Sequence, residues 1–250
     1  MLHLKILKAE TAAEVGRLAA DQFQEVMAAK PACVLGLATG STPVPLYREL
    51  AAREKAGLLD FTRVRSVNLD EYKCLAPDHP QSYRHFMQEN LFDHIAIRPE
   101  NTLVPDGLTQ DVDAMCMAYE RAIEDWGGID LQLLGLGHDG HIGFNEPCDH
   151  FPSWTHEVAL TETTRRANAR FFASEAEVPA AAYTMGVGTV MAARRVLMLV
   201  TGADKAEILR KAFFGPVTPW VPASILQFHP DVTLICDRAA WDGAGMGKEV

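Results

Sequence analysis

The chain alternates between short aliphatic runs and longer segments whose apolar residues recur at helical spacing. The runs at residues 33–38, 64–69, 129–136, 195–201 and 232–236 contain few polar side chains, as expected of parallel strands that are buried on both faces. Segments 11–29, 43–56, 111–126 and 205–214 have the pattern of amphipathic helices. Thr11 and Glu14 have the spacing of a capping box at the start of the first helix.

This alternation predicts an α/β fold: one open, mostly parallel and twisted sheet with helices on both faces, of the Rossmann-like kind. We expect the 250 residues to form a single domain, because no repeat, low-complexity tract or linker-like segment divides them. In such sheets, polar groups at the carboxyl ends of the strands face a ligand crevice. Functional residues are therefore sought in the loops that follow the predicted strands.

The loop after the run at residues 129–136 is the most informative and reads G-H-D-G-H-I-G-F-N-E-P. Its Asp139, His141 and Glu146 can form a hydrogen-bonded acid–base relay, in which the carboxylates orient the imidazole and set its proton affinity. A structural role is the alternative for His138. The loop thus predicts proton-transfer chemistry at a strand end.

Two other interpretations of this loop are weaker. Residues 135–140 match the dinucleotide fingerprint G-x-G-x-x-G, but Gly143 and Pro147 interrupt the helix that the fingerprint should open, and the motif lies in the middle of the chain. A metal site has no further His-rich element to complete it. Its ligands would be His138, Asp139, His141 and Glu146.

The loop at residues 38–43 reads A-T-G-S-T-P and leads into a helix that Pro43 would open. Gly40 allows close backbone approach, Ser41 and Thr42 supply hydroxyl donors, and free N–H groups at the helix N-terminus suit a phosphate. The loop lacks the Gly-Lys-[Ser/Thr] ending of a P-loop, which disfavours a nucleoside triphosphate. A plain helix cap, with Thr42 as the N-cap, explains this segment equally well.

Asp70 and Glu71 follow the apolar run at residues 64–69. A carboxylate at this edge of the sheet can act as a general base, particularly when burial raises its pKa toward the working pH. Taken alone, however, the segment fits better an exposed acidic turn in which Glu71 is solvated and Asp70 caps the next element.

Basic residues offer candidate anion ligands in T-T-R-R-A-N-A-R-F-F, at residues 163–172, and at Lys205. Lys205 stands at a predicted helix N-terminus after a strand, on the same crevice as Gly40, and Arg170 can bind phosphate through its planar fork. Arg165 and Arg166 are better explained as solvated surface charges.

Composition narrows the partners and the location. The net charge of −10 argues against nucleic acid, which requires a concentrated basic face. No run approaches the roughly 18 uninterrupted apolar residues of a membrane span, so no membrane partner and a cytoplasmic location are expected. The five cysteines are odd in number and widely spaced, which indicates reduced, mostly buried thiols rather than disulfides or a zinc site.

Five motifs occur in order along the chain: L-G-L-A-T-G-S-T-P, V-N-L-D-E-Y, G-H-D-G-H-I-G-F-N-E-P, A-N-A-R-F-F and T-G-A-D-K-A. Together they resemble the glucosamine-6-phosphate deaminase family over nearly the whole chain. The resemblance implies an aldose–ketose isomerisation coupled to deamination, in which D-glucosamine 6-phosphate and water give D-fructose 6-phosphate and ammonium. It implies no cofactor, neither PLP nor a metal, and a small lid at about residues 151–179.

The resemblance also implies roles for individual residues. Asp70 is the general base that moves the C2 proton to C1 through a cis-enolamine. His141 opens the pyranose ring by proton transfer at O5 and the C1 hydroxyl, and Asp139 and Glu146 are its triad partners. The implied phosphate ligands are Gly40, Ser41, Thr42, Arg170 and Lys205.

The chain departs from the family after the Glu-Pro dipeptide, where it reads C-D-H-F-P-S-W-T-H-E-V. His156 and Val158 stand where activated members carry arginine and lysine for the effector N-acetylglucosamine 6-phosphate, and Asp149 nearby is acidic. We therefore expect no activation by this effector. The C-terminal segment is short for the helical tail that helps to build larger assemblies, and self-association stays an open expectation.

Two functions of other classes share this fold class: a 6-phosphogluconolactonase-type hydrolase, and a non-catalytic sugar-phosphate-sensing domain of a transcription regulator. A lactonase needs a histidine to activate water but no base for C2, so Asp70 distinguishes the two enzymes. A regulator should bring a DNA-binding helix pair and a basic surface, which this sequence does not show.

Overall fold

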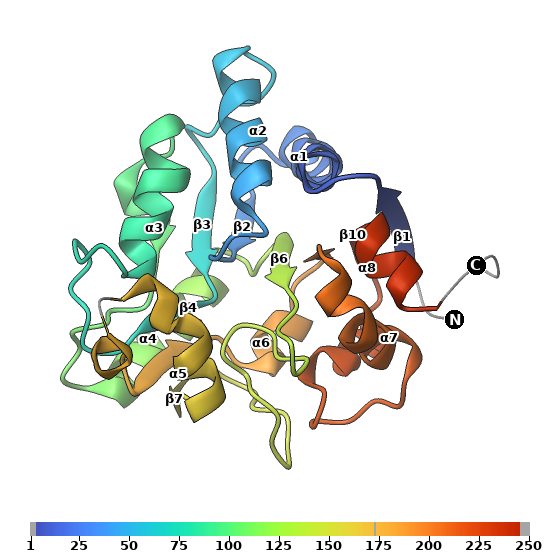
Figure 1. The fold of residues 1–250 in the computed structure, drawn as a ribbon. Coiled ribbons are helices and arrows are strands. Elements are labelled where there is room, and N and C mark those ends of the chain that lie inside the picture. The colour runs from blue at the N-terminus through green and yellow to red at the C-terminus, as the bar shows by residue number, and fades with distance from the viewer. Residues whose placement is uncertain (1–3, 173, 246–250) are drawn as a thin grey trace.

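A seven-stranded, wholly parallel sheet forms the centre of the computed structural model, which describes residues 4–172 and 174–245 (Figure 1). Its strands lie in the order β1-β10-β9-β6-β2-β3-β5, and every pairing between them is parallel. This confirms the predicted α/β class. The strands are β1 (Leu4–Ala9), β2 (Val34–Leu37), β3 (Arg65–Asn68), β5 (Thr102–Leu103), β6 (Leu131–Gly135), β9 (Val196–Val200) and β10 (Val232–Asp237).

Helices cover both faces of this sheet. In Figure 1, α1 and α2 lie on one side of it, and α6 and α7 lie on the other. The eight α-helices of the described residues are α1 (Ala12–Ala29), α2 (Val44–Lys55), α3 (Tyr83–Asn90), α4 (Val112–Asp125), α5 (Glu162–Asn168), α6 (Val187–Met191), α7 (Ala206–Phe214) and α8 (Arg238–Gly243).

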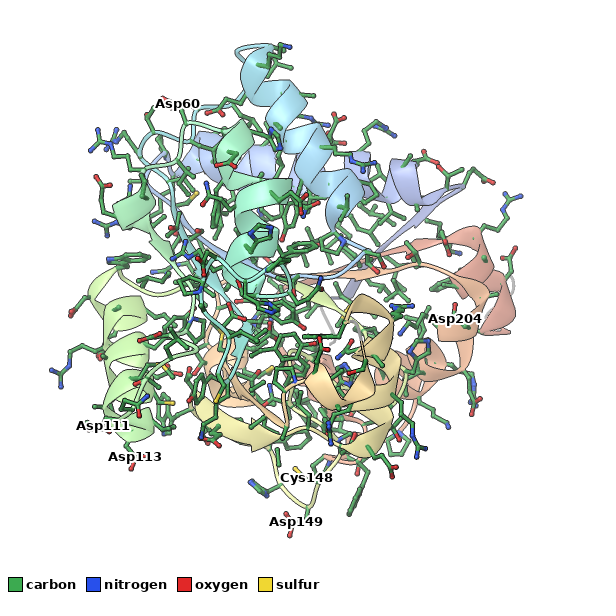
Figure 2. All side chains as sticks on the ribbon, turned by 60° about the vertical axis from the view of Figure 1, so that its left-hand side comes forward. Asp60, Asp111, Asp113, Cys148, Asp149 and Asp204 are labelled. Atoms are coloured by element: carbon green, nitrogen blue, oxygen red, sulfur yellow. The ribbon has the colours of Figure 1, made fainter. Side chains whose placement is uncertain are left out.

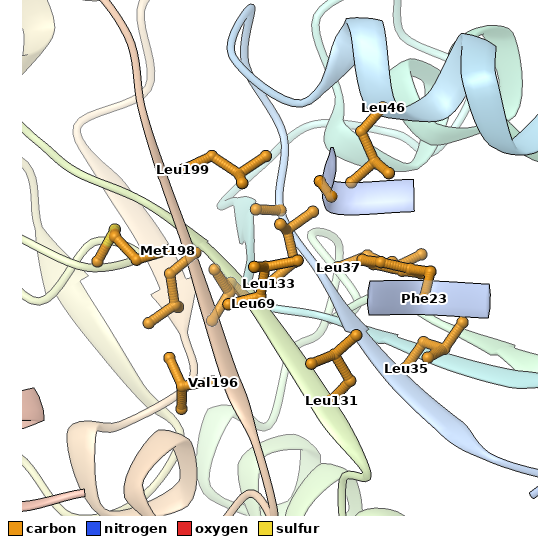
Figure 3. Close-up of a cluster of buried hydrophobic side chains, with 14 of the residues drawn as sticks. Phe23, Leu35, Leu37, Leu46, Leu69, Leu131, Leu133, Val196, Met198 and Leu199 are labelled. Atoms are coloured by element: carbon orange, nitrogen blue, oxygen red, sulfur yellow. The ribbon is translucent and has the colours of Figure 1, made fainter. Parts of the chain in front are cut away.

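The largest hydrophobic core lies between the sheet and these helices. Figure 3 shows Phe23 of α1 and Leu46 of α2 against the strands, where Leu35 and Leu37 of β2 are almost fully buried. The parallel register places Leu35 beside Leu131 of β6. The continuous aliphatic runs of the sequence therefore correspond to strands that are covered on both faces.

A second, antiparallel sheet was not predicted. It has the order β4-β8-β7, with β4 (Asp70–Tyr72), β8 (Ala181–Thr184) and β7 (His156–Ala159). β4 follows β3 after a single residue, so the chain passes from one sheet to the other at Asp70. β7 and α5 both fall within the expected lid segment 151–179, and the assignment of that segment as a lid stays a prediction.

The strand order places the switch point of the sheet between β2 and β6. The chain leaves β2 for β3 on one side, and it leaves β6 for β9 on the other. Open α/β sheets bind ligands at the carboxyl ends of the strands beside such a point. The loops that follow β3, β2, β6 and β9 consequently lie side by side.

The start of α1 differs in detail from a capping box. The Glu14 N–H donates to Thr11 Oγ1 over 3.2 Å, as predicted, but the Glu14 carboxylate accepts from the Glu10 N–H at 2.8 Å. The helix N-terminus is therefore capped by the predicted pair, with the reciprocal bond displaced by one residue.

Candidate active site

Asp70 lies at the first position of β4, just beyond the carboxyl end of β3, and is only 6% exposed. Burial, and secondarily the charge of Glu71, raises the pKa of Asp70 to about 8. A carboxylate with such a pKa is a stronger base than an ordinary aspartate and takes up a proton near neutral pH. The exposed acidic turn that the segment alone suggested is wrong.

The expectation that Glu71 is solvated is also wrong, because its side chain is only 2% exposed. Its two carboxylate oxygens accept hydrogen bonds from the backbone N–H groups of Tyr72, Tyr83 and Arg84, at 2.8 to 2.9 Å. Glu71, and not Asp70, therefore binds the first two N–H groups of the following helix α3, whose N-cap is Ser82.

The loop between β6 and Pro147 carries the histidine. His141 Nδ1 lies 2.6 Å from Asp139 Oδ1, and the His141 backbone N–H donates to the same oxygen over 3.1 Å. The two side chains are in close contact, although Nδ1 has no aligned hydrogen-bond partner. Burial works against the ionised form of Asp139, but the contact with His141 outweighs it and lowers the pKa of Asp139.

Two glycines of this loop make room for the site. A Cβ on Gly137 would lie 2.4 Å from atoms of the His141 ring. At Gly143, which has a φ of +60°, a Cβ would lie 2.8 Å from Thr184 Oγ1 and 3.5 Å from Asp70 Oδ2. The backbone two residues after His141 thus lies against the Asp70 carboxylate, so the two predicted catalytic segments meet in one site.

Glu146 has other partners than the imidazole. Its buried carboxylate accepts hydrogen bonds from the Thr161 N–H, the Thr161 hydroxyl and the Thr164 hydroxyl, all at the start of α5. Among the described residues, the ion-pair partner of His141 is Asp139, and Glu146 is not within ion-pair distance of it. The role of Glu146 as a triad partner stays a prediction, and in this arrangement the expected lid segment holds its carboxylate.

The loop at Gly40 has the features expected of an anion site. Gly40 has a φ of +98° and open space around it, Ser41 is exposed, and Thr42 is partly exposed. The helix α2 begins at Val44 with Pro43 as its N-cap, and no side chain caps it within the described part of the chain. The Thr42 cap is therefore wrong in this structure. In the first turn of α2 the Val44 N–H donates to the Ser41 carbonyl oxygen over 3.4 Å and Pro45 has no N–H group, so an anion would rely mainly on Gly40, Ser41 and Thr42.

Lys205 stands at the start of α7, as predicted. Its Nζ lies 3.0 Å from His138 Nδ1, and His138 Nε2 lies 2.7 Å from Asp204 Oδ2. Burial lowers the pKa of Lys205, and the positive charge of Arg170 lowers it further. The negative charges of Asp204 and Asp139 raise it but do not outweigh burial. The contact with His138 places this cation at the start of the His141 loop.

Several residues of the site were missed or misjudged by sequence reasoning. His138 is 70% exposed, and both its ring nitrogens have partners, Asp204 and Lys205, so the structural role considered for it stays open. Arg166 is exposed, as expected, and pairs with Glu162, but Arg165 is half-buried. The signal for His138 was its position next to a strand end.

Four aromatic rings join the segments that surround the site. Tyr72 of β4 lies 4.9 Å from Tyr83 of α3, 5.6 Å from Phe144 of the His141 loop and 5.8 Å from Phe172, measured between ring centroids. Tyr83 and Phe144 stack at 5.9 Å. Since Phe172 belongs to the expected lid segment, this aromatic cluster connects that segment with both predicted catalytic segments.

The segment that departs from the family lines a cavity of about 630 Å³, whose wall includes Cys148, His150, His156 and Val158. Figure 2 shows Cys148 and Asp149 at the tip of this loop, well apart from Asp204. Side-chain atoms of Cys148, Asp149 and His150 that could bind a metal lie within 4.8 Å of one another.

None of the five cysteines is in a disulfide, and Cys33, Cys116 and Cys236 are buried, as expected.

This arrangement can carry out proton transfers on an anionic small molecule. A base with a raised pKa, an imidazole paired with a carboxylate, and an uncapped helix N-terminus follow neighbouring strands at the switch point.

Among the described residues, no helix is both long and apolar enough to cross a membrane.

Comparison with known proteins gives consistent matches. The family model of glucosamine-6-phosphate isomerases and 6-phosphogluconolactonases matches residues 7–235. A glucosamine-6-phosphate deaminase of Lachnoclostridium phytofermentans is 53% identical over 93% of this chain and 99% of that protein. The corresponding protein of Thermoanaerobacter pseudethanolicus is 47% identical over 95% of this chain and 94% of that protein.

Solved structures agree with these matches. The structure of a monomeric glucosamine-6-phosphate deaminase superimposes with a TM-score of 0.92 at 43% identity, covering 94% of this chain and 98% of the other. A 6-phosphogluconolactonase from Thermotoga maritima has a TM-score of 0.73 at 21% identity, over 94% of this chain and 100% of the other. The second match shows a shared fold alone.

Proposed function

Because the chain belongs to the family of glucosamine-6-phosphate isomerases and 6-phosphogluconolactonases, we propose that it converts D-glucosamine 6-phosphate and water to D-fructose 6-phosphate and ammonium. The observation that carries this proposal is the buried, proton-binding carboxylate of Asp70 beside the loop of the Asp139–His141 pair. An isomerisation through C2 requires such a base, whereas lactone hydrolysis does not.

The proposed reaction begins at the phosphate. The Gly40–Thr42 loop, Lys205 and Arg170 hold this group, and the resulting binding energy positions the sugar for proton transfer. His141 then moves a proton between the C1 hydroxyl and the ring oxygen O5, which breaks the C1–O5 bond and gives the open-chain aldehyde. Asp139 orients the imidazole for this step and stabilises its protonated form.

Asp70 carries the isomerisation. Its carboxylate takes the proton from C2 while the aldehyde oxygen O1 takes up a proton from solvent, which forms the cis-enolamine. The carboxyl group then returns its proton to C1, which leaves a protonated imine at C2. Water adds to this imine, the C2–N bond breaks, and nitrogen leaves as ammonium with D-fructose 6-phosphate as the second product. C2 is oxidised as C1 is reduced within the same molecule, so no external oxidant or reductant is needed and these steps use only groups that accept and donate protons.

The direct test is product analysis of the purified protein with D-glucosamine 6-phosphate. We expect ammonium and D-fructose 6-phosphate in equal amounts, measured by independent coupled assays. The same protein is offered 6-phosphogluconolactone, whose hydrolysis is followed by acid release above the spontaneous rate. Hydrolysis of the lactone without release of ammonium from the amino sugar would replace this proposal by the hydrolase alternative.

Replacing Lys205 by alanine should weaken phosphate binding. We expect KM to rise roughly 10- to 100-fold with a smaller change in kcat, because a charge-assisted contact to a remote group is lost in ground and transition states alike. Steady-state kinetics with D-glucosamine 6-phosphate measure both constants. Lys211→Ala, which removes an exposed lysine of the same helix that pairs with Glu207, is the matched control, and an equal effect in the control contradicts the role of Lys205.

N-acetylglucosamine 6-phosphate should not activate this enzyme. The segment expected to bind it presents Val158 in place of a cation, and His156 Nδ1 lies 2.9 Å from the Trp154 carbonyl oxygen. We expect substrate saturation curves with and without the compound to coincide, apart from competition at the active site. A clear shift of the curve to lower substrate concentration contradicts this expectation.

Two further properties belong to this proposal. The cytoplasmic location follows from the sequence expectation alone. Self-association stays a prediction, and the deaminase structure with 43% identity to this chain is described as monomeric. Sedimentation at several protein concentrations distinguishes a monomer from a larger assembly.

A further inference from the structure

The Glu71 carboxylate is a buried charged group that the proposed reaction does not use. In the antiparallel register of the small sheet, Asp70 pairs with Thr184 and Glu71 with Tyr183. Neighbouring residues of a strand point to opposite faces, so Glu71 lies behind the strand that presents Asp70 to the site. Its contacts therefore act on the site from the rear of β4.

These contacts fix the start of α3. One Glu71 oxygen accepts from the Tyr72 N–H at 2.8 Å and from the Tyr83 N–H at 2.9 Å, and the other accepts from the Arg84 N–H at 2.9 Å. Tyr83 and Arg84 are the first two residues of α3, whose free N–H groups and positive dipole end favour a carboxylate. The bonds thus join β4 to a helix that begins 12 residues later.

The same contacts orient two rings of the aromatic cluster. Tyr72 and Tyr83, whose N–H groups are bound by Glu71, lie 4.9 Å apart, and both pack on Phe144 of the His141 loop. The Tyr83 hydroxyl also interacts with the Thr39 side chain, next to Gly40. Glu71 therefore supports residues that contact the base, the histidine loop and the proposed phosphate loop.

Among the described residues, the charge that raises the pKa of Asp70 is that of Glu71. The charge of Asp70 acts on four tyrosines, one each in α2, β4, α3 and α4, and burial raises the pKa of all four so that they stay neutral. These are Tyr47, Tyr72, Tyr83 and Tyr119. Burial also raises the pKa of Glu71, but its three N–H donors and the charge of Arg84 oppose the rise and favour the carboxylate.

We propose that Glu71 is a positioning residue for Asp70: its buried carboxylate fixes the first turn of α3 and, in its ionised form, places a negative charge behind the base. This inference rests on the proposed function, in which Asp70 takes the C2 proton. The charge makes Asp70 hold its proton more tightly and act as a stronger base, while the hydrogen bonds keep the surrounding rings in place.

The variant Glu71→Gln separates charge from shape. Glutamine has nearly the same volume and keeps one acceptor oxygen for the Tyr72 and Tyr83 N–H groups, but its NH₂ group faces the Arg84 N–H and cannot accept. The matched control is Ser82→Ala. Ser82 is the N-cap of α3 and accepts from the His85 N–H at 3.0 Å, so its loss loosens the same turn without removing a charge.

The readout is the pH dependence of kcat/KM for D-glucosamine 6-phosphate, since its acidic limb follows the ionisation of the free base. In Glu71→Gln we expect a lower plateau and a limb displaced to lower pH, so that the ratio of kcat/KM at pH 6 to that at pH 9 rises at least about threefold over wild type. Ionisation of the substrate is the same for all variants and cancels in this comparison.

Two outcomes overturn the inference. One is an unchanged ratio in folded Glu71→Gln, and the other is an equal displacement in Ser82→Ala, which would make the effect structural. Glu71→Asp, which restores the charge, should return the limb toward its wild-type position. Circular dichroism establishes that each variant is folded.

A measurement on the wild-type protein covers the case in which Glu71→Gln does not fold. In protein labelled with carbon-13 at its side-chain carboxyls, the Glu71 signal should titrate below that of Asp70. A Glu71 group that is still protonated at pH 7 overturns the inference. Because this titration needs no turnover, it separates failure of the inference from failure of the proposed deaminase activity.

Discussion

Asp70→Asn will lower kcat roughly 10²- to 10⁴-fold while leaving substrate affinity nearly unchanged, because the amide fills the same space but cannot accept the C2 proton. Ammonium release under single-turnover conditions measures the loss, and binding of the substrate to the inactive variant measures the affinity. Asp78→Asn, the same change at an exposed aspartate of the following loop, serves as the control. Activity within a few-fold of wild type contradicts the assigned role.

The stability of Asp70→Asn should distinguish a lost base from a damaged fold. The folded enzyme holds a proton on Asp70 up to a pKa of about 8, whereas the unfolded chain loses it near the ordinary aspartate pKa of 3.8. The folded state binds more protons in this window, so its stability falls as pH rises from about 4 to 8. Asparagine does not ionise and avoids this loss.

We therefore expect Asp70→Asn to be more stable than wild type at pH 8, by on the order of 1 kcal/mol or more, with the difference vanishing below about pH 4. Chemical denaturation at a series of pH values measures the free energy of unfolding of both proteins. An inactive variant that is also less stable than wild type at pH 8 would indicate disruption of the site rather than removal of a buried base with a raised pKa.

His141→Asn should show the second largest effect, a loss of kcat of roughly 10²-fold or more, because ring opening then lacks a group that carries a proton between O5 and the C1 hydroxyl. Asp139→Asn should lose less, since the imidazole remains and only its orientation and protonated form are affected. Steady-state kinetics with D-glucosamine 6-phosphate establish this order.

An acyclic ligand tests the step assigned to His141. A reduced, open-chain amino-alditol 6-phosphate needs no ring opening, so its Kd should differ by no more than about threefold between wild type and His141→Asn. His150→Asn is the control, since His150 is an exposed histidine that pairs with Asp149. A Kd for the acyclic ligand that weakens as much as kcat falls would assign His141 to binding instead of ring opening.

Most of the parallel sheet was predictable because its strands are buried on both faces. The runs that correspond to β2, β3, β6, β9 and β10 are short and largely aliphatic, so they do not fit the spacing of an amphipathic helix. The edge strand β1 was missed, since L-K-I-L-K-A contains lysines that an edge tolerates and a buried strand would not. The three strands of the second sheet, D-E-Y, H-E-V-A and A-A-Y-T, are only three or four residues long, too short for the aliphatic pattern that predicted the other strands.

The helix α3 and its cap show why part of the site was not predictable. In Y-R-H-F-M-Q-E-N, Met87 is the buried residue, so the apolar periodicity is too weak to predict a helix. The carboxylate that binds its first N–H groups comes from Glu71, 12 positions earlier, and no rule of local spacing relates the two. The solvated interpretation of Glu71 failed for this reason.

The catalytic segments were predictable at the level of strand ends and not at the level of contacts. Asp70 and His141 follow strands that lie on either side of β2, so topology alone brings them together. The partners of Glu146 depend on how the segment near Thr161 folds back over the loop. Such a placement comes from tertiary packing, which the residue pattern does not encode.

The ring of Phe172 meets the aromatic cluster at the site edge-on, through Tyr72. In the same expected lid segment, β7 is paired with β8 over four residues, and Leu160 is buried in the apolar cluster that includes Tyr72 and Phe144. The segment is therefore anchored by a sheet at one end, and a substitution at position 172 alters the ring contact with Tyr72 while that pairing stays in place.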